Sequence, residues 1–201
     1  MKKIGLILVV FAFLIYCPSA GQSQEVGDNA PDFSLLDASG KEIKLGDFKG
    51  KKNVVLIFYG WHNWRPCREQ LGELQKQISE IIKLDSELIA ISSKGDQDNV
   101  ERTKSALGIT YTLIPTPNRK VVLDFGLEYS TGGGAYSTII IDKKGRIRYK
   151  NIDIWSLTSA STIIKELQAI QWSDKSTYLN NIEPPKISDA VNITEISGCY
   201  K

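Results

Sequence analysis

The chain has 201 residues, of which 42% are hydrophobic and 24% are charged, so it is long enough to form one domain with a substantial core. Its formal net charge of +2 and the lack of a long basic stripe argue against a nucleic-acid-binding protein. The sequence has no internal repeat and no low-complexity tract, which excludes repeat architectures.

Residues 1–21 have the layout of a secretory signal peptide. Two lysines follow the initial methionine, residues 4–16 are an almost unbroken apolar run, and Ser19 and Gly21 are small residues suited to cleavage. The apolar run is too short to span a bilayer comfortably. We therefore expect cleavage just before Gln22 and an exported protein, either periplasmic or secreted.

Cys17 leaves two alternatives open. An apolar run that ends in cysteine is also the layout of a lipoprotein, although Tyr16 stands where a small residue is wanted. The segment could also stay uncleaved and anchor the chain to a membrane. After cleavage the chain keeps Cys67 and Cys199 in an oxidising compartment, where we expect at least one of them to do chemistry.

A polar linker over residues 22–29 leads into the domain, which we place at residues 30–172. The domain opens with a predicted hairpin of residues 33–36 and 42–45. The continuous apolar run at residues 54–59 is rich in β-branched and aromatic residues, which predicts a buried central strand.

After a loop over residues 60–66, helices and strands alternate along the chain. The predicted elements are a helix from about Cys67 to Ile82, a strand at 88–91, a helix at 99–107, an extended stretch at 109–117, a short helix at 119–125, strands at 137–142 and 147–152, and a last helix capped by Thr158 or Ser159. Residues 173–201 are predicted to form an irregular tail. This order predicts an α/β fold with a central mixed sheet and helices on both faces.

The sharpest local feature is residues 61–68, which read WHNWRPCR. A cysteine in the first turn of a helix faces the positive end of the helix dipole and several free N–H groups. Arg65 and Arg68 add positive charge, so we expect the Cys67 thiol to have a lowered pKa and to be reactive. The alternative is a buried, inert cysteine, against which the polar, arginine-rich loop argues.

The other side chains of this loop have two interpretations each. His62, the only histidine, is either a catalytic partner of Cys67 or a solvated loop residue. Trp61 and Trp64 either line a rim through which substrate reaches the thiol or pack over the helix. One histidine without a cysteine cluster does not favour a metal site, and there is no phosphate loop or nucleophile elbow, so we expect neither metal nor cofactor.

Four motifs lie in consistent order between residues 26 and 170. They are APDFSL at 30–35, the strand at 54–59 followed by WRPCREQL, LGI at 107–109 with PNRKV at 117–121, and the run STIIIDKKGRIRY at 137–149. Together they resemble the peroxiredoxin-like AhpC/TSA (redoxin) family of the thioredoxin-fold superfamily. The resemblance implies a thioredoxin-like α/β fold with an N-terminal β-hairpin.

The resemblance also implies an activity, in which Cys67 is a peroxidatic cysteine that reduces a small hydroperoxide and becomes a sulfenic acid. A second thiol then forms a disulfide with it, and an external thiol reductant such as a thioredoxin-like protein resets the cycle. Some peroxiredoxins carry the resolving cysteine near the C-terminus, often reaching a partner subunit, which makes Cys199 the candidate resolving thiol and a homodimer a possible assembly. No nucleic-acid partner is expected, and a membrane is expected only if the chain is lipid-anchored or keeps its signal.

The sequence departs from the family pattern at three positions. Gly60 stands where the family usually has proline, and Trp64 stands where it has a threonine or serine hydroxyl that orients the peroxide. Tyr136 stands where the second active-site arginine falls, and we expect it at the substrate rim with the tryptophans. The candidates to supply the missing positive charge are Arg65, Arg68 and Arg119.

Two other functions therefore remain alternatives. One is a thiol–disulfide protein of another thioredoxin-like type, but the C-x-x-C spacing of such enzymes fails on both sides, at Trp64 and at Gln70. The other is a catalytically degenerate redoxin fold that serves as a binding module. The response of the Cys67 thiol to one equivalent of hydrogen peroxide separates these alternatives from a peroxidase.

Overall fold

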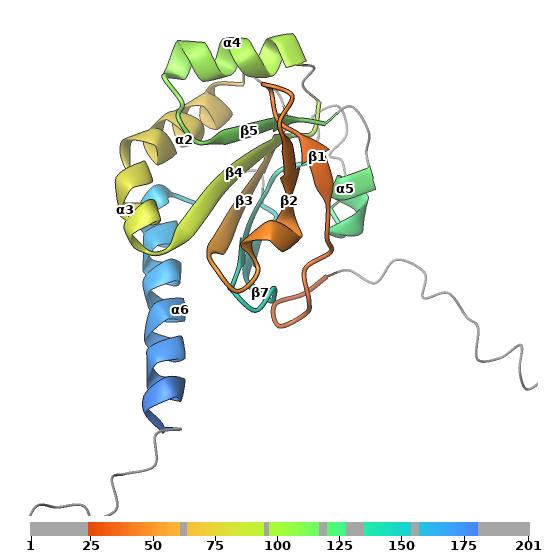
Figure 1. The fold of residues 1–201 in the computed structure, drawn as a ribbon. Helices are drawn as coiled ribbons and strands as arrows, with labels where there is room; N and C mark the ends of the chain where they lie inside the picture. Colours follow the sequence, from red (N-terminus) through yellow and green to blue (C-terminus); the bar gives the residue numbers. More distant parts are fainter. Residues whose placement is uncertain are drawn as a thin grey trace, which may run out of the picture.

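A five-stranded sheet lies at the centre of the computed structural model (Figure 1). Its strands in chain order are β3 (Asn53–Tyr59), β4 (Ser86–Ser92), β5 (Thr112–Pro115), β6 (Ser137–Ile141) and β7 (Ile147–Asn151). They lie side by side in the order β5-β4-β3-β6-β7. Strands β3, β4 and β5 are parallel, whereas β6 is antiparallel to β3 and β7 is antiparallel to β6. The predicted mixed sheet is confirmed.

The structure describes the greater part of the domain. The described residues are 24–60, 64–94, 97–116, 120–127, 135–153 and 157–180. Trp61, His62 and Arg119 lie outside them, as do the predicted signal segment with Cys17 and the C-terminal segment with Cys199.

The predicted N-terminal hairpin is a separate two-stranded sheet. Strand β1 (Ser34–Leu36) pairs antiparallel with β2 (Glu42–Lys44), and a short 3-10 helix, η1 (Leu45–Phe48), follows. The amide of Ala38 in the hairpin turn donates a hydrogen bond to the carbonyl of Leu113 in β5, at 3.1 Å. This bond attaches the hairpin to the edge of the main sheet.

Helices cover both faces of the central sheet, as the sequence predicts. They are α2 (Arg65–Lys76), α3 (Ile78–Lys83), α4 (Gln97–Leu107), α5 (Lys120–Asp124) and α6 (Ala160–Asn180). The cluster of buried side chains on one face draws on α2, α3, α4 and α6, and the cluster on the other face draws on α5 and the hairpin.

Strand β3 supplies both clusters, because successive side chains of a strand point to opposite faces. Val55, Ile57 and Tyr59 join the cluster that contains α2, and the alternate residues Val54 and Phe58 join the cluster of the other face. Every residue of β3 is buried. Burial on two faces explains why its sequence is a continuous apolar run rather than an alternating one.

Two helices differ from their predicted extents. The helix predicted from Cys67 to Ile82 is broken at Gln77, which has φ −105° and ψ 8° and separates α2 from α3. Helix α6 continues past Trp172 to Asn180, where an irregular tail was expected. Between 160 and 180 there is neither glycine nor proline, so the polar composition of this stretch lowers its burial without ending the helix.

None of the helices in the described ranges combines the length and the hydropathy that crossing a bilayer requires.

Candidate functional site

The site is built at the point where β3 ends and α2 begins. Tyr59 is the last residue of β3, and α2 starts at Arg65 with Pro66 in its first turn. Proline suits that position because its missing N–H would have no partner inside the helix. Cys67 follows directly, so the cysteine lies in the first turn of a helix at the carboxyl end of a central strand, as the sequence predicts.

Cys67 is nevertheless buried, which the sequence analysis did not expect. It is 1% exposed and belongs to the core cluster together with Leu71 and Leu74 of the same helix. Burial raises the pKa of the Cys67 thiol to about 12, and a hydrogen bond from the backbone of Gly60 opposes that rise only in part. The prediction of a lowered pKa is wrong for this structure, because the thiol turns into the core with the apolar side of the helix.

The two arginines beside Cys67 point to the opposite side of α2. Arg65 is 87% exposed and forms an ion pair with Glu69 at 2.7 Å. Arg68 is also exposed, and both arginines line an open groove between α2 and α4. Helical periodicity explains the separation: residues 65, 68 and 69 share one side of the helix and residue 67 does not. The structure therefore does not bring Arg65 or Arg68 to the thiol, and the third candidate, Arg119, lies outside the described residues.

Trp64 and Tyr136, two of the three predicted rim residues, do come together. Their ring centroids are 5.0 Å apart and their planes meet at 70°, an edge-to-face arrangement. Tyr136 is 6% exposed and belongs to the same buried cluster as Cys67, and Trp64 is half-buried and packs against that cluster. The third rim residue, Trp61, lies outside the described residues.

Two further tyrosines near the thiol were missed by the sequence analysis. Tyr59 is completely buried, and its pKa is raised by burial, with Cys67 as a smaller contributor. The side chain of Ser92 lies near the Tyr59 hydroxyl and lowers the pKa of Tyr59, an effect smaller than that of burial. The Tyr59 hydroxyl nevertheless has no hydrogen bond of good geometry among the described residues. Tyr111 donates its hydroxyl to the carbonyl of Leu71 at 3.0 Å, and burial raises its pKa too.

Only one of these tyrosines had a signal in the sequence. Period-two alternation puts Tyr59 on the same face of β3 as Val55 and Ile57, and therefore on the side of α2. Tyr111 precedes β5, which lies two strands away from β3 in the sheet. A single sequence does not reveal that neighbourhood.

Ser93, which the sequence analysis also missed, ties three chain segments together beside the site. Its backbone N–H donates to the carbonyl of Tyr59 at 2.8 Å. Its hydroxyl accepts a hydrogen bond from the amide of Ala135 at 3.0 Å and donates to the carbonyl of Tyr59 at 3.1 Å. Ser93 thus fixes the ends of β3 and β4 against the residues that precede β6.

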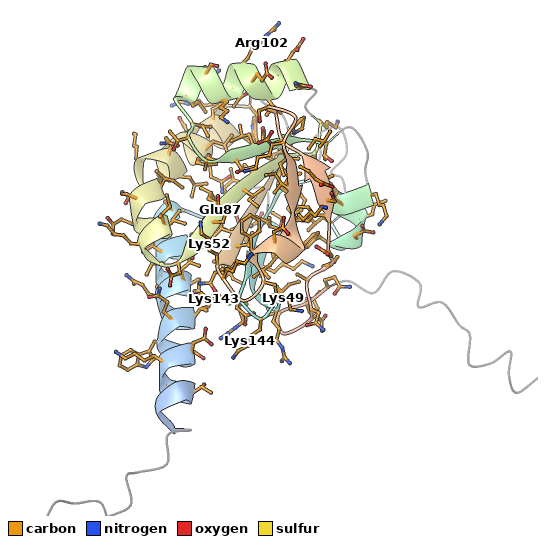
Figure 2. The ribbon with its side chains drawn as sticks, viewed as in Figure 1. Lys49, Lys52, Glu87, Arg102, Lys143 and Lys144 are labelled. Atoms are coloured by element: carbon orange, nitrogen blue, oxygen red, sulfur yellow. The ribbon has the colours of Figure 1, made fainter. Side chains whose placement is uncertain are left out.

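The lysine-rich end of the molecule is not part of this site. Figure 2 shows Lys49, Lys143 and Lys144 gathered away from α4, which carries Arg102. Lys52 adjoins the first residue of β3, whereas the site adjoins its last residue. A cavity of about 310 Å³ lies at this lysine-rich end, between the segment that precedes β1, the helix η1 and the sheet, and no site residue lines it.

Metal ligands are not clustered in the described part of the chain, where no group of three or more histidine, cysteine, aspartate or glutamate side chains converges. Cys67 is the one cysteine that the described residues contain, and it is not in a disulfide there. Among the described residues the arrangement therefore offers one sulfur, buried in an apolar cluster that also holds Tyr59 and Tyr136, as the candidate reacting group.

Comparison with known proteins identifies the family. The sequence model of the AhpC/TSA family matches residues 26–150. Peroxiredoxin-2 from Bos taurus is 30% identical over 161 residues, covering 75% of this chain and 80% of that protein. The thiol-disulfide oxidoreductase ResA from Geobacillus thermodenitrificans is 28% identical over 146 residues, covering 71% of this chain and 79% of that protein.

The solved structures agree with this on the fold. The reduced 2-Cys peroxiredoxin of Plasmodium vivax has a TM-score of 0.66 at 23% identity, covering 75% of this chain and 98% of that chain. Peroxidoxin BcpB from Mycobacterium tuberculosis has a TM-score of 0.66 at 20% identity, covering 73% and 98%. The predicted thioredoxin-like fold is confirmed, and the chain belongs to the AhpC/TSA family of thiol-dependent oxidoreductases.

Proposed function

We propose that the chain is an exported, thiol-dependent peroxidase whose reacting atom is the sulfur of Cys67. The observation that supports this best is the position of Cys67, in the first turn of α2 at the carboxyl end of the central strand β3. A site is expected at that edge of an open α/β sheet. The relatives named peroxiredoxins support the peroxide as the substrate.

The proposed reaction needs the thiol to lose its proton first. The thiolate then attacks one oxygen of the hydroperoxide, the O–O bond breaks, and the leaving alkoxide or hydroxide takes up a proton. The products are a Cys67 sulfenic acid and an alcohol or water. A second thiol attacks the sulfenic acid, which releases water and forms a disulfide, and an external thiol of the thioredoxin-like class reduces that disulfide.

The burial of Cys67 works against this first step. It raises the pKa of the thiol to about 12, so very little thiolate is present at neutral pH. The thiolate is the nucleophile, so we expect slow reaction in the conformation described here and faster reaction in any conformation that admits water to the sulfur.

The direct test is peroxide consumption by the full chain with a thiol reductant. We expect Cys67→Ser to abolish consumption and to keep the circular dichroism spectrum of the unchanged chain. Cys17→Ser serves as the matched control and should retain activity. Full activity in Cys67→Ser would overturn the assignment.

Cys199 is our candidate for the resolving thiol, although it lies outside the described residues. Peroxide treatment followed by a non-reducing gel and peptide mapping should show a Cys67–Cys199 disulfide, within one chain or between two copies. It should appear before any Cys67 sulfinic acid. If Cys67 over-oxidises at the same rate in Cys199→Ser as in the unchanged chain, Cys199 has no resolving role.

Thiol–disulfide exchange is the second candidate function. One observation favours it, the similarity to a thiol-disulfide oxidoreductase. The raised pKa of Cys67 slows both reactions, because the thiolate is the nucleophile in each. One equivalent of hydrogen peroxide and one equivalent of a small disulfide, offered separately, distinguish the candidates by which one consumes the Cys67 thiol. A thiol that reacts with neither at more than the rate of a denatured-state cysteine indicates the third alternative, a non-catalytic binding module.

A further inference from the structure

Two aromatic side chains from distant parts of the sequence meet beside the buried thiol. Trp64 is the residue before α2, with an extended backbone at φ −73° and ψ 118°, and its side chain packs against the buried cluster to which Cys67 belongs. Tyr136 is the residue before β6, the strand that pairs with β3 in the sheet. The centroid distance of 5.0 Å and the angle of 70° make this a direct edge-to-face contact.

The three side chains differ in how much solvent they meet. Cys67 is 1% exposed and Tyr136 is 6% exposed, whereas Trp64 is half-buried. Both aromatic rings pack in or against the cluster that contains the sulfur. Trp64 is therefore the partly exposed member of this group, and its ring contacts the buried ring of Tyr136.

The Tyr136 half of the contact is held by a serine. The hydroxyl of Ser93 accepts the amide hydrogen of Ala135, the neighbour of Tyr136, at 3.0 Å. Ser93 is itself anchored to the carbonyl of Tyr59 at the end of β3. Because all these groups are buried, loss of the hydroxyl would leave the amide of Ala135 without that partner and loosen the backbone on which Tyr136 stands.

We propose that the Trp64–Tyr136 contact is the closure that separates Cys67 from solvent, with Ser93 as the positioning residue for its Tyr136 half. Reagents reach the sulfur when Trp64 turns away from Tyr136, and the thiolate gains hydration in the same movement. This inference rests on the proposed function only in taking Cys67 as the reacting thiol. In this proposal Trp64 and Tyr136 together control access to Cys67, whereas the sequence predicted only that they line the rim of the site.

The size of the expected effect follows from the contact. An edge-to-face aromatic pair corresponds to about a two- to tenfold change in an opening equilibrium. Replacing Trp64 by alanine should therefore speed the reaction of Cys67 by at least that factor, because the variant also removes the rest of the indole.

Alkylation by iodoacetamide tests this without any peroxide. The full chain is alkylated at pH 8, and each cysteine is followed as its own peptide by mass spectrometry. We expect Trp64→Ala to alkylate Cys67 about tenfold faster and Trp64→Phe to stay within about twofold of the unchanged chain. The matched control is Trp172→Ala, because Trp172 is 75% exposed on α6; it should change nothing at Cys67.

The positioning residue is tested in the same assay. Ser93→Ala should also speed alkylation of Cys67. The double variant Trp64→Ala/Ser93→Ala should be no faster than Trp64→Ala alone, because one closure is lost in both cases. Rates that multiply in the double variant would overturn the assignment of Ser93 to this closure.

Two measurements separate closure from general loss of stability. Alkylation of the unchanged chain at low urea concentrations should stay constant, since local opening exposes little surface, whereas passage through global unfolding would make it rise steeply. Trp64→Ala should also move the pH dependence of alkylation to lower pH than it lies in Trp172→Ala, compared at equal free energy of unfolding. Equal alkylation rates in Trp64→Ala and Trp172→Ala, at equal stability, would overturn the proposal.

The peroxide reaction is measured on the same variants. If alkylation changes as expected while no variant reacts with peroxide, the closure stands and the proposed peroxidase function fails. If peroxide oxidises Cys67 equally fast in the unchanged chain and in Trp64→Ala, the peroxidase stands and the closure fails.

Discussion

At Cys67 two physical effects act on the thiol in opposite directions. The first turn of α2 favours the thiolate, but a helix terminus contributes only about 0.3–1 kcal/mol to a nearby charge. Removing an unpaired anion from water costs several kcal/mol. The burial of Cys67 therefore outweighs the helix dipole, and its pKa rises rather than falls.

This balance predicts the pH dependence of Cys67 chemistry. A thiol with an ordinary pKa of about 8.5 comes close to its full alkylation rate at pH 10, whereas the rate at Cys67 should still rise about tenfold per pH unit between pH 8 and 10. The measurement is peptide-resolved alkylation in buffers where circular dichroism shows the fold intact, with a free cysteine peptide as control. A rate at Cys67 that levels off by pH 10, as the control peptide does, would contradict the buried thiol.

At the scale of elements, the start of α6 offers a defined test. The amide of Thr162 donates to the hydroxyl of Ser159 at 3.2 Å, one of the two caps that the sequence predicts for this helix. We expect Ser159→Ala to lower the free energy of unfolding by about 1 kcal/mol, because that amide loses its partner. Urea unfolding measures it, and Ser176→Ala, at an exposed position of the same helix, should stay within about 0.5 kcal/mol.

The helices and strands could be predicted where burial or a helix cap requires a particular pattern of residues. The apolar run of β3 and the serine that caps α6, Ser159, are two such patterns. The break at Gln77 leaves none, because glutamine fits a helix interior as well as the turn that it forms here. Helix α6 was predicted too short because its last turns have few apolar residues. A low apolar content indicates that a segment is exposed, and it does not indicate that the segment is irregular.

The candidate site was predicted in part, and its geometry was not. The place of Cys67 in the first turn of a helix follows from the motif, and the sequence named Trp64 and Tyr136 as rim residues without predicting that their rings meet. The burial of the thiol could have been predicted, because Cys67, Leu71 and Leu74 recur at helical spacing and so lie on one side of the helix. The neighbouring arginines instead favoured the prediction of an exposed cysteine. Ser93 acts through main-chain groups of β3 and of the segment before β6, a contact that one sequence does not encode locally.

At the scale of the whole molecule, the predictions concern where the chain resides. We expect an exported protein that begins near Gln22 and lacks Cys17, because residues 1–21 have the order basic, apolar, small. Intact-mass spectrometry of the protein recovered from outside the cytoplasm gives its first residue. A diacylglycerol-modified Cys17 at the amino terminus would establish the lipoprotein alternative instead.

Export would also define the chemistry that the molecule meets. In an oxidising compartment a free thiol persists when it is shielded or when a reductant restores it. The 1% exposure of Cys67 supplies the shielding. The fold thus places one buried sulfur at the carboxyl end of the central strand β3. This burial favours a thiol that reacts only after the site opens.

The most direct measurement is the fate of the Cys67 sulfur after one equivalent of hydrogen peroxide. The full chain is treated at pH 7.5, quenched at intervals with dimedone, and mapped by mass spectrometry. The predicted result is a dimedone-trapped sulfenic acid on the Cys67 peptide that forms slowly in the unchanged chain and sooner in Trp64→Ala. A Cys67 peptide that stays unoxidised while the chain consumes the peroxide elsewhere would contradict the assignment of Cys67 as the redox centre.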